Sequence, residues 1–501
     1  MDATISPFVM VIFGATGDLT GRKLMPAIYN LLSQKILPDR FHIVGVARRN
    51  MTHDQFRNLM HEALTDHFKP QLDSSVWHKL ANNLYYQDGY FEKPETYNKL
   101  VHLLATFDKE VGACISRFFY LATPPEHYSS ILDHLDKSKL SEGCGQGSKK
   151  WTKVLIEKPF GKDLETAKQL EYKLSKVFDE RQIYRIDHYL AKETIQNILA
   201  FRFANTLFKS VWDKDHIDNI QITLSEEGGV GERGNFYEGV GALRDIAQNH
   251  LMAMLAYISM EEPVSFTAGD IRTERVRALS ALRSIEKEEV GSMVVRGQYS
   301  RGMRSGKKIP GYREERNVDP NSNTETYVAA KLFIDNDRWK GMPFYLRTGK
   351  RLKSSVVQID IQFANPQSLI FREYKFPREY HANTLSINIQ PKEGITFRFL
   401  AKAPGLLMEL KPVNMDFLYK RSFKRDIVDS YDKLLIDSIR GDQTLFATGP
   451  GFKSTWTLAT KIMKGWEALP APQFPNYSPF SWGPKEADEL LQRDGRHWLL
   501  H

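Results

Sequence analysis

The stretch of sequence that decides the fold is residues 8–20, FVMVIFGATGDLT. Its six leading apolar residues are typical of a buried strand, and Gly14 and Gly17 follow that strand directly. Glycine allows a tight turn and a close approach to a pyrophosphate, whose charge meets the free N–H groups at the start of the next helix. Strand-to-helix turns also need glycine for backbone reasons alone, so the surrounding pattern matters. The candidate cofactor ligands here are Gly14, Thr16, Gly17, Asp18 and Leu19.

The sequence beyond this turn alternates short strands with amphipathic helices. Apolar runs at residues 41–47, 117–122 and 153–156 have the length of buried strands. Thr52 and Asp163 are good helix N-caps ahead of amphipathic stretches. This alternation predicts a doubly wound parallel sheet, so we expect an α/β, Rossmann-like, dinucleotide-binding domain over residues 1–195.

The pattern changes after about residue 195. Apolar and polar residues alternate around 220–224, 327–333, 356–363 and 385–389, as in strands that have one covered face. We therefore expect a second domain with a large, mainly antiparallel sheet over residues 196–501.

Two stretches of this second region have an unusual composition. Residues 301–323 are polar and contain glycine and proline, which predicts a long surface excursion. Residues 470–482 are aromatic and rich in proline, and they form either an ordered wrap or a contact with a partner.

Length and composition exclude several classes of protein. A chain of 501 residues corresponds to two or three domains of about 150 residues each. Hydrophobic residues make up 42% and charged residues 26%, which is typical of globular proteins and not of disordered or fibrous ones. The net charge of +8 is spread along the chain, so we expect anionic small molecules, and no nucleic acid, as partners.

The sequence lacks the patterns of a membrane span, a signal peptide and a zinc site, and these absences predict where the protein resides and whether it holds a metal. No stretch reaches the ~18 uninterrupted apolar residues of a membrane span, and the first residues do not resemble a signal peptide. We therefore expect a cytoplasmic protein without a membrane partner. Cys114 and Cys144 lack the spacing of a zinc site, so we predict no metal and two buried, inert thiols.

The end of the second predicted strand indicates which dinucleotide binds. Arg48 and Arg49 stand near the place where NAD enzymes carry an acidic residue for the ribose 2′-hydroxyl. An arginine there accommodates a 2′-phosphate and stacks on adenine, so we expect NADP as the cofactor. The alternative is that one or both arginines only solvate a strand end.

The strand at residues 153–156 runs into Glu157-Lys158-Pro159, at the edge of the sheet where open α/β proteins bind ligands. The proline keeps Lys158 out of helical conformation and permits a cis peptide bond, which aims the lysine into a cleft. A plain turn is the alternative explanation.

Residues 185–193, RIDHYLAKE, form the densest group of polar side chains. If a helix begins at His188, then His188 and Lys192 lie four residues apart on one face, beside Tyr189. An imidazole, an ammonium group and a phenol together suit a phosphate dianion. The alternative is an ordinary helix start at which Lys192 faces solvent.

Polar residues also cluster around residues 226–250. Glu226 ends an alternating strand, and Asp245 and His250 precede an apolar helix. At 3.6 residues per turn Asp245 and His250 would lie about 140° apart, on different sides of a helix. We therefore expect them to contact different atoms of one ligand, unless His250 is a structural residue.

These blocks together resemble the glucose-6-phosphate dehydrogenase family. The blocks are GATGDL, EKPFG, RIDHYLAKE, RDIAQNHLMAML and residues 338–350, RWKGMPFYLRTGK, and they span nearly the whole chain in the family's order. The resemblance implies that residues 1–195 form an NADP-binding domain and that residues 196–501 form an α+β domain for substrate binding and oligomerisation. Assembly as a homodimer or homotetramer is implied as well. It also implies oxidation of glucose 6-phosphate to 6-phosphogluconolactone with NADP, the first step of the oxidative pentose phosphate pathway.

The resemblance further implies a role for each candidate residue. His250 matches the catalytic base and Asp187 the carboxylate that orients it. Lys158 matches the lysine between cofactor and sugar, and Arg48 the contact to the 2′-phosphate. The phosphate site is matched by His188, Tyr189 and Lys192, and the sugar hydroxyls by Glu226, Asp245 and Lys350.

The residue types suit this chemistry, although three positions depart from the family pattern. A histidine can accept the proton of the C1 hydroxyl near neutral pH while hydride leaves C1. Thr20 stands where the family usually has glycine or alanine, and Ala191 replaces the usual glycine, but both remain small. The family often has a second lysine about five residues after Lys350, whereas Lys353 comes only three residues after it. The alternatives are a dehydrogenase of an unphosphorylated sugar and a dinucleotide-binding sensor without catalytic activity.

Overall fold

The computed structural model describes residues 5–69, 71–143, 152–365, 370, 383–424 and 428–500. It divides into two compact units. The first unit contains Met1–Ala191, Phe266–Arg272 and Val428–Gly449, and the second contains Lys192–Ser265, Thr273–Ile427 and Pro450–His501. The first unit thus ends close to the predicted boundary at residue 195, but it also includes two later segments of the chain.

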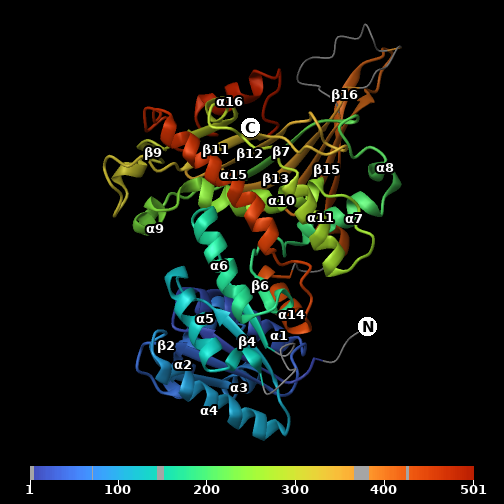
Figure 1. The fold of residues 1–501 in the computed structure, drawn as a ribbon. Helices are drawn as coiled ribbons and strands as arrows, with labels where there is room; N and C mark the ends of the chain where they lie inside the picture. The colour runs from blue at the N-terminus through green and yellow to red at the C-terminus, as the bar shows by residue number, and fades with distance from the viewer. Residues whose placement is uncertain are drawn as a thin grey trace. The chain divides into compact units, whose positions relative to one another are not determined.

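The first unit is built on a six-stranded parallel sheet with the order β3-β2-β1-β4-β5-β6. This is the strand order of a Rossmann fold, so the predicted α/β class is confirmed. The strands are β1 Phe8–Phe13, β2 Phe41–Ala47, β3 Leu84–Asp88, β4 Ser116–Leu121, β5 Thr152–Ile156 and β6 Ile183–Arg185. Figure 1 labels β2, β4 and β6 of this sheet.

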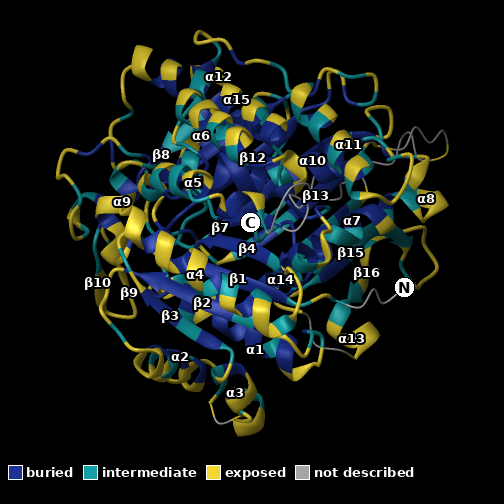
Figure 2. Ribbon diagram, turned by 60° about the horizontal axis from the view of Figure 1, so that its bottom comes forward, coloured by how far each residue is buried: buried dark blue, intermediate teal, exposed yellow. Residues whose placement is uncertain are grey.

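Helices connect these strands, and their caps follow from the sequence. They are α1 Met25–Ser33, α2 His53–Phe68, α3 Ser74–Ala81, α4 Pro94–Val111, α5 Tyr128–Lys137 and α6 Leu164–Val177. Thr52 Oγ1 accepts a hydrogen bond from Gln55 N–H at 3.2 Å, and Asp163 Oδ1 accepts one from Thr166 N–H at 2.8 Å. Both predicted N-caps are confirmed. Strands β1 and β2 are dark blue in Figure 2, whereas α2 and α3 expose yellow faces.

A late segment of the chain completes the first unit. Helix α14, Ser430–Arg440, packs beside α1. The Lys153 ammonium group, on β5, donates to the carbonyls of Ser438 and Ile439 at 2.7 and 3.2 Å. A cation is favourable at the C-terminal end of a helix, where the last carbonyls lack partners within the helix. These contacts explain why residues 428–449 belong to the first unit and not to the second.

The second unit contains an eight-stranded sheet with the order β16-β15-β14-β13-β7-β12-β11-β8. Only β7 and β12 pair in parallel among the described strands of this sheet, so the predicted large, mainly antiparallel sheet is confirmed. The strands are β7 Ile217–Ser225, β8 Val294–Gly297, β11 Tyr327–Leu332, β12 Phe344–Gly349, β13 Val356–Phe363, β14 Thr384–Gln390, β15 Gly394–Lys402 and β16 Leu410–Leu418.

Helices of the second unit include α7 Glu193–Phe203 and α10 Met252–Ser259, and α15 Gly449–Ala468 belongs to this unit from Pro450 onward. The C-terminal carbonyls of α10 are bound by buried side chains. The Arg202 guanidinium donates to the carbonyls of Tyr257 and Met260 at 2.8 and 2.7 Å. The indoles of Trp212 and Trp339 donate to the carbonyls of Ile258 and Ser259. These bonds satisfy the helix end and fix α10 in the second unit.

Both unusual stretches of the second region are ordered. Within 301–323, β9 Gly302–Arg304 and β10 Lys307–Ile309 form a hairpin, and Tyr312 is buried in an aromatic core. Most residues of this stretch are exposed, so the predicted surface excursion is confirmed, and Tyr312 anchors it in the core. Residues 470–482 form an ordered wrap, since the Tyr477 hydroxyl donates to the Lys350 carbonyl at 2.7 Å and Lys353 N–H donates to the Ser481 carbonyl at 2.9 Å.

The described helices and Cys114 bear on the predictions about membrane spans and thiols. Among the described residues, no helix is both long and apolar enough to cross a membrane. Cys114 is exposed and is not a free thiol, so the prediction of a buried, inert thiol is wrong for it, and Cys144 lies outside the described residues.

Candidate active site

The glycine turn after β1 has the backbone geometry that its sequence predicts. Gly14 has a φ of +86°, and its N–H donates to the Val46 carbonyl at 2.8 Å. A Cβ atom at Gly14 would lie 2.4 Å from the Ala122 carbonyl oxygen, so no other residue fits. Gly17 N–H closes the turn on the Gly14 carbonyl at 2.9 Å, and the buried Thr20 hydroxyl lies 3.5 Å from the same oxygen. Thr20 therefore fits behind the turn.

The surroundings of this turn fit a dinucleotide phosphate. Gly17 and Asp18 are exposed, Thr16 and Leu19 are half-buried, and Asp18 pairs with Arg22 at 2.7 Å. Arg48 is exposed directly after β2, the strand next to β1, so it lies at the same carboxyl edge of the sheet. A tight glycine turn and an exposed guanidinium at one sheet edge match the needs of an anionic dinucleotide.

The end of β5 places a carboxyl group among tyrosine hydroxyls. Glu157 Oε1 accepts hydrogen bonds from the hydroxyls of Tyr120 and Tyr431 at 2.6 and 3.2 Å. Although part of the side chain stays accessible, desolvation raises the pKa of Glu157 to about 7. Lys158 follows, half-buried, and the Lys158–Pro159 peptide bond is cis. Sequence reasoning missed Tyr431, because it lies far along the chain.

The block that contains Asp187 is a turn and not the predicted helix start. Tyr189 N–H donates to Asp187 Oδ1 at 3.0 Å, and Leu190 N–H donates to the Asp187 carbonyl at 3.0 Å. An aspartate that binds the backbone two residues ahead favours a turn over a helix. The ring centroid of His188 lies 4.6 Å from that of Tyr189 and 6.3 Å from that of Tyr431. The first unit therefore brings Asp187, His188 and Tyr189 together.

Lys192 stands in the second unit, as the residue that precedes α7. It has an extended backbone, so the predicted helical face shared by His188 and Lys192 is wrong. The Lys192 side chain is half-buried. Burial of Glu393 raises the pKa of that carboxyl group, and the positive charge of Lys192 partly offsets this increase.

Three predicted substrate residues meet in the second unit. Lys350 is only 3% exposed, and its ammonium group pairs with the Glu226 carboxylate and lies 3.7 Å from Asp245 Oδ2. Glu226 and Lys350 follow β7 and β12, which are adjacent parallel strands with Ser225 opposite Gly349. The ammonium nitrogen also lies 5.3 Å from the centre of the Tyr237 ring. The site thus presents two carboxylates and one ammonium group, which suit sugar hydroxyls.

The segment that carries Asp245 and His250 is a π-helix, η7, Leu243–Leu251. In a π-helix the hydrogen bonds join residues five apart, so residues five apart lie about one turn from each other. Asp245 and His250 therefore lie on the same side, and the predicted separation of about 140° is wrong. The prediction assumed 3.6 residues per turn, which holds only for an α-helix.

A buried glutamate that the sequence did not reveal holds the start of this π-helix. Glu325 Oε1 accepts a hydrogen bond from Leu243 N–H at 3.0 Å, and the Glu325 carbonyl accepts one from Ala242 N–H at 3.0 Å. A Cβ atom at Gly241 would lie 2.3 Å from the Glu325 carboxylate. Lys350 N–H donates to the carbonyl of the next residue, Thr326, at 2.9 Å. Glu325 and Thr326 thus connect the π-helix to Lys350.

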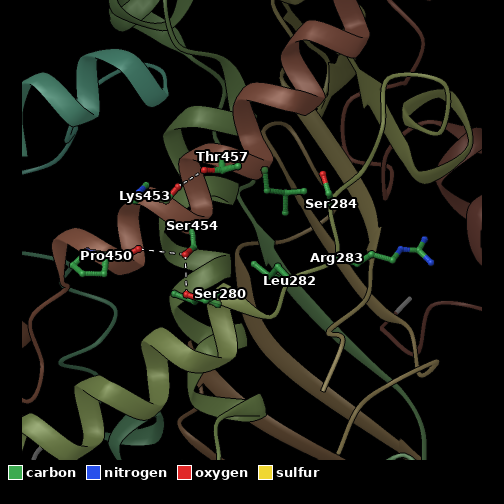
Figure 3. Close-up of a pocket in the computed structure, with 10 residues that line it drawn as sticks. Ser280, Leu282, Arg283, Ser284, Pro450, Lys453, Ser454 and Thr457 are labelled. Atoms are coloured by element: carbon green, nitrogen blue, oxygen red, sulfur yellow. Dashed lines mark hydrogen bonds between the residues drawn. The ribbon is translucent and has the colours of Figure 1, made fainter. Parts of the chain in front are cut away.

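A pocket of about 380 Å³ in the second unit contains none of the predicted site residues. Two serine hydroxyls of this pocket already have hydrogen-bond partners in the protein. The Oγ atoms of Ser280 and Ser454 lie 3.2 Å apart, and the Ser454 hydroxyl donates to the Pro450 carbonyl at 3.3 Å (Figure 3). Arg283 points away from these hydroxyls in Figure 3 and stacks on the Phe333 ring at 4.4 Å. We therefore place the candidate active site at the strand ends and not in this pocket.

Comparisons with known proteins point to one family. A model described as the NAD binding domain of glucose-6-phosphate dehydrogenase matches residues 11–197, and a model of the C-terminal domain of the same enzyme matches residues 199–499. A glucose-6-phosphate 1-dehydrogenase of Chlamydia pneumoniae is 45% identical over 496 residues, covering 99% of this chain and 96% of that protein. The enzyme of that name from Bacillus subtilis is 40% identical, covering 98% of each chain.

Solved structures agree with this result. A glucose-6-phosphate dehydrogenase in complex with its substrate glucose-6-phosphate has a TM-score of 0.89 and 31% identity, covering 99% of this chain and 100% of that one. A glucose-6-phosphate 1-dehydrogenase from Mycobacterium avium has a TM-score of 0.82 and 32% identity, covering 99% of each chain.

The Glu157→Gln substitution should flatten the pH dependence of stability between about pH 4.5 and 7. Burial raises the pKa of Glu157 from 4.5 to about 7, so the folded state binds more protons than the unfolded state in this range. The stability contributed by this group is therefore lost as the pH rises through 7. Glutamine does not titrate. Melting temperatures measured from pH 4.5 to 7.5 test this, with Glu126→Gln as an exposed control, and parallel wild-type and Glu157→Gln profiles would contradict it.

Proposed function

The chain belongs to the glucose-6-phosphate dehydrogenase family, and we propose that it oxidises D-glucose 6-phosphate to 6-phospho-D-glucono-1,5-lactone. As a member of this family it is an NADP-dependent oxidoreductase. The observation that carries the proposal is the cluster of Glu226, Asp245 and the buried Lys350, because it offers a sugar both acceptors and a donor. By the same proposal, the protein performs the first step of the oxidative pentose phosphate pathway in the cytoplasm.

His250 is the general base in the proposed reaction. The C1 hydroxyl must lose its proton as hydride leaves C1, and an imidazole has the basicity to accept a proton near neutral pH. Asp187 is the carboxylate that orients the imidazole and stabilises its protonated form. When bound, NADP⁺ supplies the hydride acceptor, C4 of its nicotinamide ring.

The remaining residues bind and orient the two substrates. Lys158 lies between cofactor and sugar, and Arg48 binds the 2′-phosphate of NADP. The pyrophosphate is held by the turn of Gly14, Thr16, Gly17, Asp18 and Leu19, the 6-phosphate by His188, Tyr189 and Lys192, and the sugar hydroxyls by Glu226, Asp245 and Lys350. Binding of the phosphate, which does not react, helps to hold C1 within reach of the hydride acceptor.

The division of labour between domains is also part of the proposal. Residues 1–195 bind NADP, and residues 196–501 bind the sugar phosphate and mediate assembly. The ranges matched by the two family models, 11–197 and 199–499, support a division near this point.

The reaction itself is tested by absorbance at 340 nm with glucose 6-phosphate and NADP⁺. Plain glucose and NAD⁺ serve as comparison substrates. Reduction of NADP⁺ only with the phosphorylated sugar is the expected result. Reduction with plain glucose alone would contradict the phosphate assignment, and no reduction in any mixture would favour a dinucleotide-binding protein without this activity.

The His250→Asn substitution should lower kcat by about 10²-fold or more, as expected for the loss of a general base. Asparagine keeps polarity and approximate size but cannot accept the proton. His216→Asn is the control, because His216 is an exposed residue of the same unit that pairs with Asp213. Near-normal turnover in the His250→Asn variant would remove His250 from this role.

The Lys192→Ala substitution should raise KM for glucose 6-phosphate by about 10-fold or more, with a smaller change in kcat. A hydrogen bond to a charged group contributes about 1.5–3 kcal/mol, and each 1.4 kcal/mol is a factor of ten. Lys209→Ala is the control, because Lys209 is an exposed lysine that pairs with Glu262. An unchanged KM would exclude Lys192 from the phosphate site.

We also propose a homodimer or homotetramer, assembled through the second unit. Exposed apolar side chains gather on β16 and the turn before it: Leu406, Leu407, Met408 and Met415. Large apolar groups exposed together are typical of a contact between proteins.

Light scattering should therefore give a mass of two or four times the 57.7 kDa of one chain. The Met415→Glu substitution should lower that mass, because it buries a charge in the proposed contact. A monomeric wild-type protein at micromolar concentration would contradict the assembly.

A further inference from the structure

The side chain of Asn249 bonds to the backbone of the π-helix that contains it. Its Nδ2 donates to the carbonyls of Asp245 and Arg244 at 3.0 and 3.3 Å, and its Oδ1 accepts a hydrogen bond from His250 N–H at 2.5 Å. The carboxamide therefore links the backbone of Asp245 to the backbone of His250. Asn249 is buried, so these bonds are shielded from water.

This link joins the two residues that the π-helix places on one side. A helix with a side chain inserted among its backbone hydrogen bonds departs locally from α geometry. With α geometry, Asp245 and His250 would lie about 140° apart and could not serve one substrate from the same side. With the π turn they do lie on one side, and Asp245 stands 3.7 Å from the Lys350 ammonium group.

The two ends of the helical segment are fixed, so the extra residue of the π turn has to be accommodated between them. At the start, the buried Glu325 carboxylate accepts the hydrogen bond from Leu243 N–H. At the far end, α10 continues from the π-helix, and Arg202 and Trp339 bind its last carbonyls. The π turn that contains Asn249 therefore lies between two ends that are bound by side chains from other parts of the chain.

We propose that Asn249 is a positioning residue, which keeps Asp245 and His250 on one side of the helix by linking their backbones. The proposal rests on the function proposed above, in which Asp245 holds a sugar hydroxyl and His250 accepts the C1 proton. Asn249 itself acts only through these two residues.

The adjacent Gln248 provides a matched control. It is also a buried amide of the same π-helix, but its Nε2 donates to Thr455 Oγ1 at 2.9 Å. The Gln248→Ala and Asn249→Ala substitutions therefore each remove one buried carboxamide, and only the second removes the link between Asp245 and His250. Asn249→Asp is a third variant, which keeps an acceptor for His250 N–H but has no donor for the Asp245 carbonyl.

The experiment measures kcat, KM for glucose 6-phosphate, NADP⁺ affinity and melting temperature for all three variants. We expect kcat/KM to fall about 30-fold or more in Asn249→Ala and Asn249→Asp, with changes in both kcat and KM. In Gln248→Ala it should stay within about threefold of wild type at a comparable melting temperature. Unchanged NADP⁺ affinity would show that the first unit is intact in every variant.

Two kinetic results would overturn the proposal. One is wild-type kcat and KM in Asn249→Ala, and the other is an equal loss in Gln248→Ala, which would indicate general destabilisation. A crystal structure of Asn249→Ala tests the geometry without relying on activity. Because both ends of the segment stay fixed, the π turn should move away from Asn249, and Asp245 and His250 should lie on different sides of the helix. If Asp245 and His250 still share one side of the helix in Asn249→Ala, the positioning role of Asn249 is wrong. If the wild-type protein does not oxidise glucose 6-phosphate, the proposed function is wrong.

Discussion

The arrangement of the second unit depends on the need to balance the buried ammonium group of Lys350. A charge that is 3% exposed is costly unless carboxylates and hydrogen bonds compensate it. Glu226 and Asp245 supply that compensation, and they come from the end of β7 and from the π-helix. Three distant parts of the chain are therefore brought to one point by electrostatics, at a strand edge where polar groups remain available to a ligand.

Buried polar groups fix the supporting structure in the same way. Glu325 accepts the first N–H of the π-helix, and Arg202 binds the last carbonyls of α10. In the first unit, the buried Arg185 is paired with Glu171 and Glu180 at 2.6 and 2.9 Å. Removing one partner of such a group leaves the other unsatisfied, which costs more than the bond itself contributes. These contacts hold the elements that carry the candidate site residues in place.

Much of the fold and part of the site could be predicted from local sequence. The strands of the first unit are continuous apolar runs, and Thr52 and Asp163 cap helices by contacts three residues away. Gly14 is required by its own φ and by the closeness of Ala122. The proximity of Glu226 and Lys350 could not be predicted from spacing, because it depends on the parallel pairing of β7 with β12.

The sequence by itself determined the two kinds of sheet, the glycine turn, the helix caps and the family of this protein, because these depend on residue type and short-range spacing. Only the tertiary structure decided that residues 428–449 complete the first unit, and that Asp245 and His250 share one side of a π-helix. The reason is that the period of a helix depends on partners such as Asn249 and Glu325, and that the place of α14 depends on a distant partner, Lys153. Local periodicity does not reveal such partners, because the side chains that select the geometry bind the backbone or lie far along the chain.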